Sequence, residues 1–141
     1  MTTVKISKRL VQQVRQRADQ RCEYCQSPEW LTGQLCQIDH IQPRTNGGAT
    51  SPENLCLACA ACNGFKLDRT AAVDPVSKQT VTLFHPRQQV WSEHFEWNAD
   101  QTEIVGLSAC GRATVIALKM NRPLAVAARA MWRRISANSK D

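Results

Sequence analysis

The stretch that decides the fold is residues 37–66, QIDHIQPRTNGGATSPENLCLACAACNGFK. Apolar residues at 35–41 predict a short strand, and turn-forming residues at 43–52, with Asn46-Gly47-Gly48 among them, predict a loop. Residues 55–57 predict the returning strand, and residues 63–70 fit a short helix with Asn63 near its N-cap. The sequence therefore predicts a strand, a loop, a second strand and a helix, in that order.

Two Cys-x-x-Cys pairs accompany this stretch, Cys22 with Cys25 and Cys59 with Cys62. Four thiolates in paired knuckles suit tetrahedral zinc with every coordination position filled, so the site is expected to be structural. Such a site contributes on the order of 10 kcal/mol of apparent folding free energy. The competing interpretation, a redox Cys-x-x-Cys, needs a βαβ context that the sequence does not offer.

The remaining cysteines are interpreted as packing residues. Cys56 also has ligand spacing to Cys59, but the pair Cys59 and Cys62 leaves Cys56 inside the apolar run 55–58. A thiol in such a run serves as a small buried hydrophobe. Cys36 and Cys110 receive the same interpretation.

Composition bounds the classes of protein and partner. The 141 residues, 43% hydrophobic and 21% charged, suffice for one compact unit with a modest core. The first ten residues lack the apolar run of a signal peptide and no later segment has the length of a membrane span, so we expect a cytosolic protein. The chain has seven cysteines, an odd count. Because the cytosol keeps thiols reduced, these cysteines favour a metal site over disulfides. The net charge of +6 favours a polyanionic partner, although an inert basic surface has the same composition.

An amphipathic helix is predicted at residues 7–20. Ser7 is available as the N-cap, and apolar residues recur at helical spacing at Leu10, Val11, Val14 and Ala18. We interpret this as a packing helix with a solvated basic face rather than as a DNA-reading helix.

The order of polar residues between the knuckles resembles a known family. Asp39-His40, Asn54 and Asn63, followed by Lys66, look like the motif of HNH endonucleases, over about residues 21–69. The resemblance implies an α+β protein whose core is a ββα-metal fold stapled by a four-cysteine zinc site. The third motif position is often histidine in the family, and this chain carries the variant Asn63.

The resemblance also implies roles for these residues in cutting a DNA phosphodiester. His40 would be the general base, and Asn54 would tie down the loop and help to fix the histidine ring. Asp39 and Asn63 would offer hard oxygen ligands to one Mg²⁺ or Mn²⁺ ion, in contrast to the soft thiolates that suit zinc. As a simple helix cap, Asn63 would need no metal. Basic side chains near the motif are expected to contact flanking phosphates: Arg44, Lys66 and Arg69.

One geometric condition follows for Asp39 and His40. Neighbours on a regular strand point to opposite faces, so the strand must end or distort there if both are to face one phosphate. Pro43 is consistent with an early end, because proline cannot donate a ladder hydrogen bond.

The second half predicts strands at residues 81–84, 90–97 and 103–107, with a turn at 98–100. Trp91, Phe95 and Trp97 would share one face of the middle strand, which favours a core role over a base-stacking platform. His94 would lie on the opposite face. These strands predict a C-terminal β-meander.

Two helices are expected to close the chain, one from Ser108, its cap, to residue 120 and one from residue 123 to about 135. Arg129 and Arg133 fall away from the apolar stripe of the last helix, so they form either a DNA-backbone contact or a solvated arginine face. We divide the chain into a nuclease core with its N-terminal helix and knuckles at 1–71 and a C-terminal β/α extension at 72–141, packed as one unit.

The sequence leads to the hypothesis of a zinc-stapled, metal-dependent DNA endonuclease. Its main alternative is a zinc-ribbon module that binds nucleic acid without cutting it. A third possibility is an HNH subunit that is active only within a larger restriction, phage or mobile-element complex. No membrane partner is expected, and the sequence identifies no protein partner.

Overall fold

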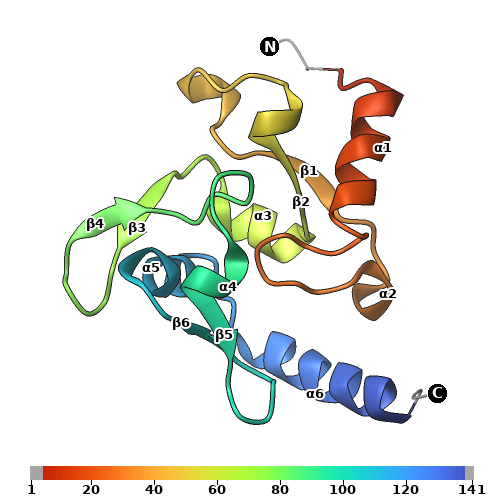
Figure 1. Cartoon of the computed structure of the whole chain (residues 1–141), viewed down its shortest axis with the longest axis vertical. Helices are drawn as coiled ribbons and strands as arrows, with labels where there is room; N and C mark the ends of the chain where they lie inside the picture. Colours follow the sequence, from red (N-terminus) through yellow and green to blue (C-terminus); the bar gives the residue numbers. More distant parts are fainter. Residues whose placement is uncertain (1–4, 139–141) are drawn as a thin grey trace.

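Short antiparallel strand pairs and helices alternate along the chain in the computed structural model, which describes residues 5–138 (Figure 1). The strands pair as β1 (Gln37–His40) with β2 (Leu55–Ala58), β3 (Ala71–Val73) with β4 (Thr80–Thr82), and β5 (Phe95–Trp97) with β6 (Ile104–Gly106). The helices are α1 (Lys8–Arg17), α2 (Glu29–Thr32), α3 (Ala60–Lys66), α4 (Trp91–His94), α5 (Ala109–Ala117) and α6 (Pro123–Asn138). Two 3-10 turns, Arg44–Asn46 and Pro52–Asn54, lie in the loop between β1 and β2. The chain is therefore α+β, as predicted. The predicted C-terminal β-meander is wrong, because β4 pairs with β3 and not with β5.

The β1–β2 pair is the centre of the first half. Its register sets Asp39 opposite Cys56 and His40 opposite Leu55. All of β2 is buried because α1 packs on one of its faces, around Val14, and the four-cysteine cluster and α3 lie on the other. The apolar run at 55–58 is therefore the sequence of a strand covered on both sides.

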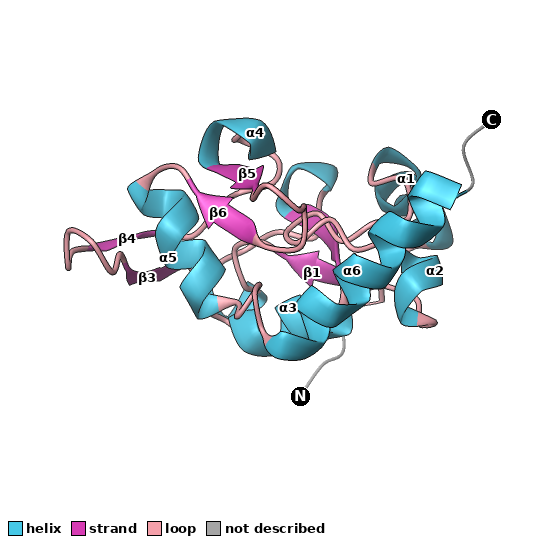
Figure 2. Cartoon of the chain, turned by 90° about the horizontal axis from the view of Figure 1, so that it is seen from below, coloured by secondary structure: helices cyan, strands magenta, loops and turns pink. Residues whose placement is uncertain are grey.

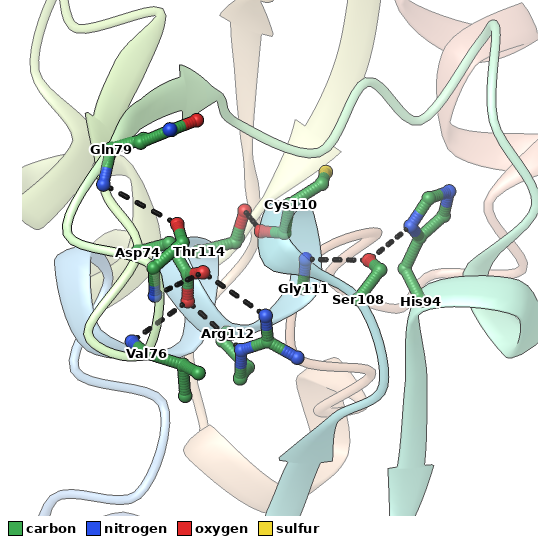
Figure 3. A network of polar contacts seen from close by, with 10 residues as sticks. Asp74, Val76, Gln79, His94, Ser108, Cys110, Gly111, Arg112 and Thr114 are labelled. Carbon is green, nitrogen blue, oxygen red and sulfur yellow. Dashed lines mark hydrogen bonds and ion pairs between the residues drawn. The ribbon is translucent and has the colours of Figure 1, made fainter.

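Two predicted helix caps are confirmed. The hydroxyl of Ser7 accepts a hydrogen bond from the backbone N–H of Leu10 at 3.1 Å, and α1 begins at the next residue after Ser7. The hydroxyl of Ser108 accepts from the N–H of Gly111 at 3.0 Å and lies 2.6 Å from Nδ1 of His94 (Figure 3). Both hydroxyls satisfy amide groups that a helix leaves unpaired at its start.

The predicted start of α3 is wrong by three residues. The helix begins at Ala60, and its N-cap is Cys59, whose sulfur accepts from the N–H of Cys62 at 3.4 Å. The knuckle itself is thus the first turn of the helix, and two alanines, which favour helix strongly, follow the cap. Asn63 lies inside α3 and is not its cap.

The strand predicted at residues 90–97 is wrong in its first half. Residues 91–94 form the helical turn α4, and only Phe95–Trp97 pair with β6. The indole N–H of Trp91 donates to the carbonyl of Tyr24 at 2.8 Å. This tertiary hydrogen bond holds Trp91 in a helical turn, although tryptophan favours strands. The short strand β3 was not predicted, and it crosses the boundary predicted between residues 71 and 72.

One core joins the two halves of the chain. Buried residues from the knuckles, from β2 and from the C-terminal half form a single cluster, which includes Tyr24, Cys56, Phe84, Phe95 and Met120. The hairpin of β3 and β4 lies at one end of the molecule, beside α5 (Figures 1 and 2). No helix within residues 5–138 combines the length and apolar character needed to cross a bilayer.

The β3–β4 hairpin is attached to α5 by a buried ion pair. Arg112 donates two hydrogen bonds to Asp74, from Nε at 2.9 Å and from Nη2 at 3.0 Å (Figure 3). Asp74 also accepts from the backbone N–H groups of Val76 and Ser77. The Arg112 guanidinium therefore holds the pKa of Asp74 well below its usual range. Asp74 thus fixes both the hairpin turn and its docking.

The substitution Asp74→Asn is expected to lower the thermal midpoint at neutral pH by several degrees, because Arg112 would lose its charged partner. The depressed pKa means that this stabilisation is present above the ordinary carboxyl pKa and is lost only as pH falls below it. Thermal unfolding followed by circular dichroism measures the effect. Asp68→Asn, at an exposed carboxylate, is the control, and an equal change in both variants would contradict the role of Asp74.

Candidate active site and metal centre

The four predicted zinc ligands come together. The sulfur atoms of Cys22, Cys25, Cys59 and Cys62 all lie within 4.8 Å of one another, and each residue is buried. Within each knuckle, the N–H of the second cysteine points at the sulfur of the first, at 3.4 Å in both. These N–H···S hydrogen bonds stabilise the thiolate form of the accepting sulfurs before any cation binds.

The electrostatics of this cluster favour a bound cation. Burial raises the pKa of the Cys22 thiol, whereas a hydrogen bond from Cys22 lowers the pKa of Cys25. Four thiolates at such short separations repel one another, so they ionise together only around a positive ion. An all-sulfur, closed and buried donor set fits Zn²⁺ in a structural role.

The other three cysteines lie outside the cluster. Cys56 is fully buried on β2, and its thiol donates to Oδ2 of Asp39 at 3.8 Å. Cys36 is half-buried, and burial raises the pKa of its thiol to about 12. Cys110 is also half-buried and free. Their surroundings keep these thiols neutral.

Asp39 is buried and already has a cationic partner. The ammonium of Lys66 lies 3.2 Å from Oδ2, and the hydroxyl of Tyr24 donates to the same oxygen at 3.0 Å. Lys66 also donates to the carbonyl of His40 at 3.4 Å. Within residues 5–138, no hydrogen bond engages Oδ1 of Asp39, so one carboxylate oxygen remains free for a further ligand.

Asn63 faces the same side of β1 from one turn earlier on α3. Its Nδ2 donates to Oε1 of Gln37 at 2.5 Å, which leaves its Oδ1 without a partner in the described part of the chain. Gln37 and Asp39 are two apart on β1, and Asn63 and Lys66 are three apart on α3. Strand and helix periodicity therefore place both oxygen donors along one strand–helix interface.

His40 lies on the other face of β1. The ladder is regular to the end of the strand, and His40 is set opposite Leu55, which faces α1. Nε2 of His40 lies 2.9 Å from the hydroxyl of Thr50, whereas Nδ1 makes no hydrogen bond within residues 5–138. Burial lowers the pKa of His40, against an opposing effect of Asp39, so the ring is neutral near pH 7. The strand does end at His40, but this ending does not itself turn the two side chains to one face.

Asn54 clamps the loop that carries Thr50. Its Oδ1 accepts from the N–H of Gln42 at 2.8 Å, and its Nδ2 donates to the carbonyls of Gln42 at 2.9 Å and Ala49 at 2.8 Å. Its own carbonyl accepts from the N–H of Ile41. The amide thus fixes both ends of the loop immediately after His40.

This clamp leaves no room for a side chain at Gly48. A Cβ atom there would lie 1.7 Å from the carbonyl oxygen of Gln42 and 2.9 Å from Nδ2 of Asn54. The first neighbour is backbone, so the loop must move if the contact is to be relieved.

The substitution Gly48→Ala is therefore expected to destabilise the protein by about 1–3 kcal/mol, the usual cost of overpacking. Chemical denaturation measures the change. Gly64→Ala is the matched control, because a Cβ at Gly64 meets open space on α3 and should stabilise the helix by about 0.5–1 kcal/mol. Tolerance of Gly48→Ala without loss of stability would contradict the tight clamp.

A cavity of about 290 Å³ opens beside this arrangement. Lys66, Ile41 and Gln42 line it from the first half, and His85 lines it from the second. Burial lowers the pKa of His85. The cavity therefore gives a small polar group access to the region of Lys66.

The predicted nucleic-acid contacts fall into two groups. Arg44 is exposed in the loop, Arg69 is exposed and donates to the carbonyls of Phe65 and Ala117, and Arg133 is half-exposed on α6. Lys66 and Arg129 are each 1% exposed. Lys66 is buried and pairs with the carboxylate of Asp39, so it does not have the exposed position expected of a phosphate contact.

The predicted surface position of Arg129 is wrong as well. Its guanidinium donates to the carbonyls of Met120 at 2.5 Å and Thr102 at 3.1 Å, and to Oδ1 of Asn121 at 3.2 Å. A side chain enclosed in this way cannot reach a phosphate at the surface. The helical periodicity of α6 separated Arg129 from one apolar stripe, but it could not show that the turn after α5 and the loop between β5 and β6 enclose its guanidinium.

Three residues that organise the site were not predicted from the sequence. Thr50 orients the ring of His40, Tyr24 donates to Asp39, and Gln37 holds the amide of Asn63. Tyr24 is an ordinary knuckle residue and Thr50 an ordinary loop residue in the sequence. Only Gln37 carried a usable pattern, because it shares the strand face of Asp39.

Comparison with known families and proteins adds one positive finding. Residues 22–69 match the model of the HNH endonuclease family. No curated protein and no solved structure matches the chain. The match begins at the first cysteine of the cluster and ends three residues after α3, so it includes β1, β2 and α3 but none of the elements from β3 onward. This segment is about a third of the chain, and it is similar to the HNH endonuclease family.

Proposed function

We propose that the protein is a metal-dependent endonuclease that hydrolyses DNA phosphodiester bonds, with β1, β2 and α3 as its ββα-metal element. His40 is the general base, and Asp39 and Asn63 hold one Mg²⁺ or Mn²⁺ ion. The observation that carries the proposal is the shared interface of Asp39 and Asn63, each with a free oxygen, inside the segment that matches the family. Oxygen donors of this kind suit both ions.

The residues divide the chemistry between them. The cation supplies charge stabilisation for the phosphoryl oxygens and the leaving alkoxide when it is bound. Oδ1 of Asp39 and Oδ1 of Asn63 would be its protein ligands. The ammonium of Lys66 pairs with Oδ2 of the buried Asp39 and orients the carboxylate. Lys66 therefore presents the carboxylate for coordination from one side.

His40 takes the proton from the attacking water. A neutral imidazole is needed for this step, and burial favours that form. Thr50 holds Nε2, and the clamp of Asn54 holds the loop that carries Thr50, so Nδ1 is the nitrogen left for the proton. Asp39 and His40 occupy opposite faces of β1, so the proposal requires the scissile phosphate to lie past the end of the strand.

The ligand role of Asn63 is tested by substitution at that position. Asn63→Ala is expected to reduce plasmid cleavage by at least about tenfold and to raise the Mg²⁺ or Mn²⁺ concentration needed, since one oxygen donor is lost. Asn63→Asp keeps an oxygen at the same place and should retain cleavage. Metal titrations of nicking and linearisation on agarose gels measure both variants. Wild-type metal dependence in Asn63→Ala would contradict the ligand role.

A second candidate function is nucleic-acid binding without hydrolysis. The observation that favours it is the ion pair of Asp39 with Lys66, because a carboxylate that already has a cation needs no metal. This function predicts salt-sensitive DNA binding, no products with either ion, and binding that survives Asp39→Ala. The cleavage assay distinguishes the two.

A further inference from the structure

An open groove lies between the first knuckle and the C-terminal half of the chain. Its volume is about 540 Å³, and it is bordered by α4, β5, α6 and the segment around the first knuckle. The side chains that line it include three tryptophans and two arginines: Trp91, Trp97, Trp132, Arg21 and Arg133. We call it the tryptophan–arginine groove. None of these residues takes part in the proposed hydrolysis.

The rings of the groove form a continuous aromatic lining. The centroids of Trp91 and Trp97 are 5.9 Å apart, and those of Trp97 and Trp132 are 6.2 Å apart with the planes at 84°. Trp132 is nearly buried, whereas Trp91 and Trp97 are each partly exposed. The lining therefore offers apolar ring surface to a ligand, beyond what the core covers.

Two guanidinium groups complete the groove. The guanidinium of Arg133 stacks on Trp132 at 4.2 Å and on Trp97 at 4.6 Å from the ring centroids. That of Arg21 lies 5.4 Å from the centroid of Trp132. Each arginine is thus held over an aromatic ring and lines the groove.

The positive charge in the groove is not neutralised. Arg133 donates to the carbonyl of Gln101, and no carboxylate lies within 4 Å of it in the described part of the chain. The only acidic neighbour of Arg21 there is Asp19, at 4.0 Å and on a solvent-exposed side chain. Burial lowers the pKa of Arg133, and the nearby charges of Arg129 and Arg21 lower it further. A polyanion would relieve this repulsion.

We propose that the tryptophan–arginine groove binds an unpaired segment of nucleic acid, with bases stacked on the tryptophans and phosphates paired with Arg21 and Arg133. Aromatic faces beside cations suit single strands, because every unpaired base has a free face to stack. A duplex keeps its base faces covered. An acidic peptide would use the arginines but not the rings.

The groove is joined to the candidate active site through Tyr24. The carbonyl of Tyr24 accepts from the indole of Trp91, and its hydroxyl donates to Asp39. The inference deepens the proposed function by naming a substrate class: DNA with an unpaired segment next to the bond that is cut. It rests on that function for the nucleic-acid ligand, but binding itself does not depend on cleavage.

The experiment measures binding of fluorescein-labelled oligothymidylate to the zinc-loaded full chain by anisotropy and by quenching of tryptophan fluorescence. No Mg²⁺ or Mn²⁺ is added, so the result is independent of cleavage. Arg133→Glu is expected to weaken binding by about tenfold or more, because it reverses one charge and removes a stacked plane. Arg133→Lys keeps the charge without the plane, and it should lose less than Arg133→Glu.

Arg134→Glu is the matched control. Arg134 is the next residue on α6 and is exposed, so its reversal makes the same change in net charge outside the groove. It should weaken binding by less than about threefold. Equal losses in Arg133→Glu and Arg134→Glu would overturn the proposal, as would binding of polyglutamate in preference to oligothymidylate. Binding that persists in a protein with no cleavage activity would support the groove and reject only the proposed hydrolysis.

Discussion

Removal of the metal from the four-cysteine cluster is expected to unfold the protein. The four sulfurs lie in the core cluster that both halves share, and the hydrogen bond from the N–H of Cys62 to the sulfur of Cys59 caps α3. Structural zinc contributes about 10 kcal/mol or more of apparent folding free energy, which exceeds the net stability of many small domains. Loss of the ion leaves buried thiolates that repel each other.

The measurement is circular dichroism during titration with a strong chelator, with zinc content determined on the same sample. We expect one zinc per chain and loss of helical signal as zinc leaves. Cys59→Ser should reproduce the loss without chelator. Cys36→Ser is the control, because Cys36 lies outside the cluster, and it should keep both zinc and fold. A zinc-free chain that stays folded would contradict the structural role.

Replacement of His40 with alanine is expected to reduce DNA cleavage by about 10²–10⁴-fold, the usual contribution of a general base. The ring is half-buried at the end of β1 and bonds to Thr50, so its removal leaves the core unchanged. Stability should therefore change little. The loss would be one of rate, in the presence of saturating Mg²⁺ or Mn²⁺.

Thr50→Ala provides a graded comparison. It leaves the imidazole in place but removes the hydroxyl that orients it, so we expect a smaller loss of cleavage than in His40→Ala. Single-turnover cleavage of labelled DNA measures both. A larger loss of cleavage in Thr50→Ala than in His40→Ala would contradict the proposal that Thr50 acts by orienting the imidazole.

The thiolate cluster was predictable because its information is local. Two Cys-x-x-Cys pairs form two knuckles, and a reduced, buried set of four sulfurs has few alternatives to a metal. The caps at Ser7 and Ser108 were predictable for the same reason, because each hydroxyl bonds an amide three residues ahead. Strand pairing between β1 and β2 followed from two apolar runs joined by one loop.

The errors lie where distant residues decide the outcome. Trp91 is helical because its indole bonds to Tyr24, which is far away in sequence. Lys66 and Arg129 appear as surface charges in a helical pattern, but each is buried by contacts from other elements. The tryptophans were assigned to the core, and only the fold shows that Trp132 and Arg133 extend their cluster into a groove. No periodicity within one segment carries that information.

The most direct test of the proposed endonuclease function measures zinc content and Mg²⁺-dependent plasmid cleavage on the same preparations of wild type and His40→Ala. In the proposed function, a thiolate site serves folding and a separate oxygen and imidazole site serves catalysis. We expect one zinc per chain in both proteins, cleavage by wild type, and cleavage reduced by at least about a hundredfold in His40→Ala. Equal cleavage by the two zinc-loaded proteins would contradict the proposed function.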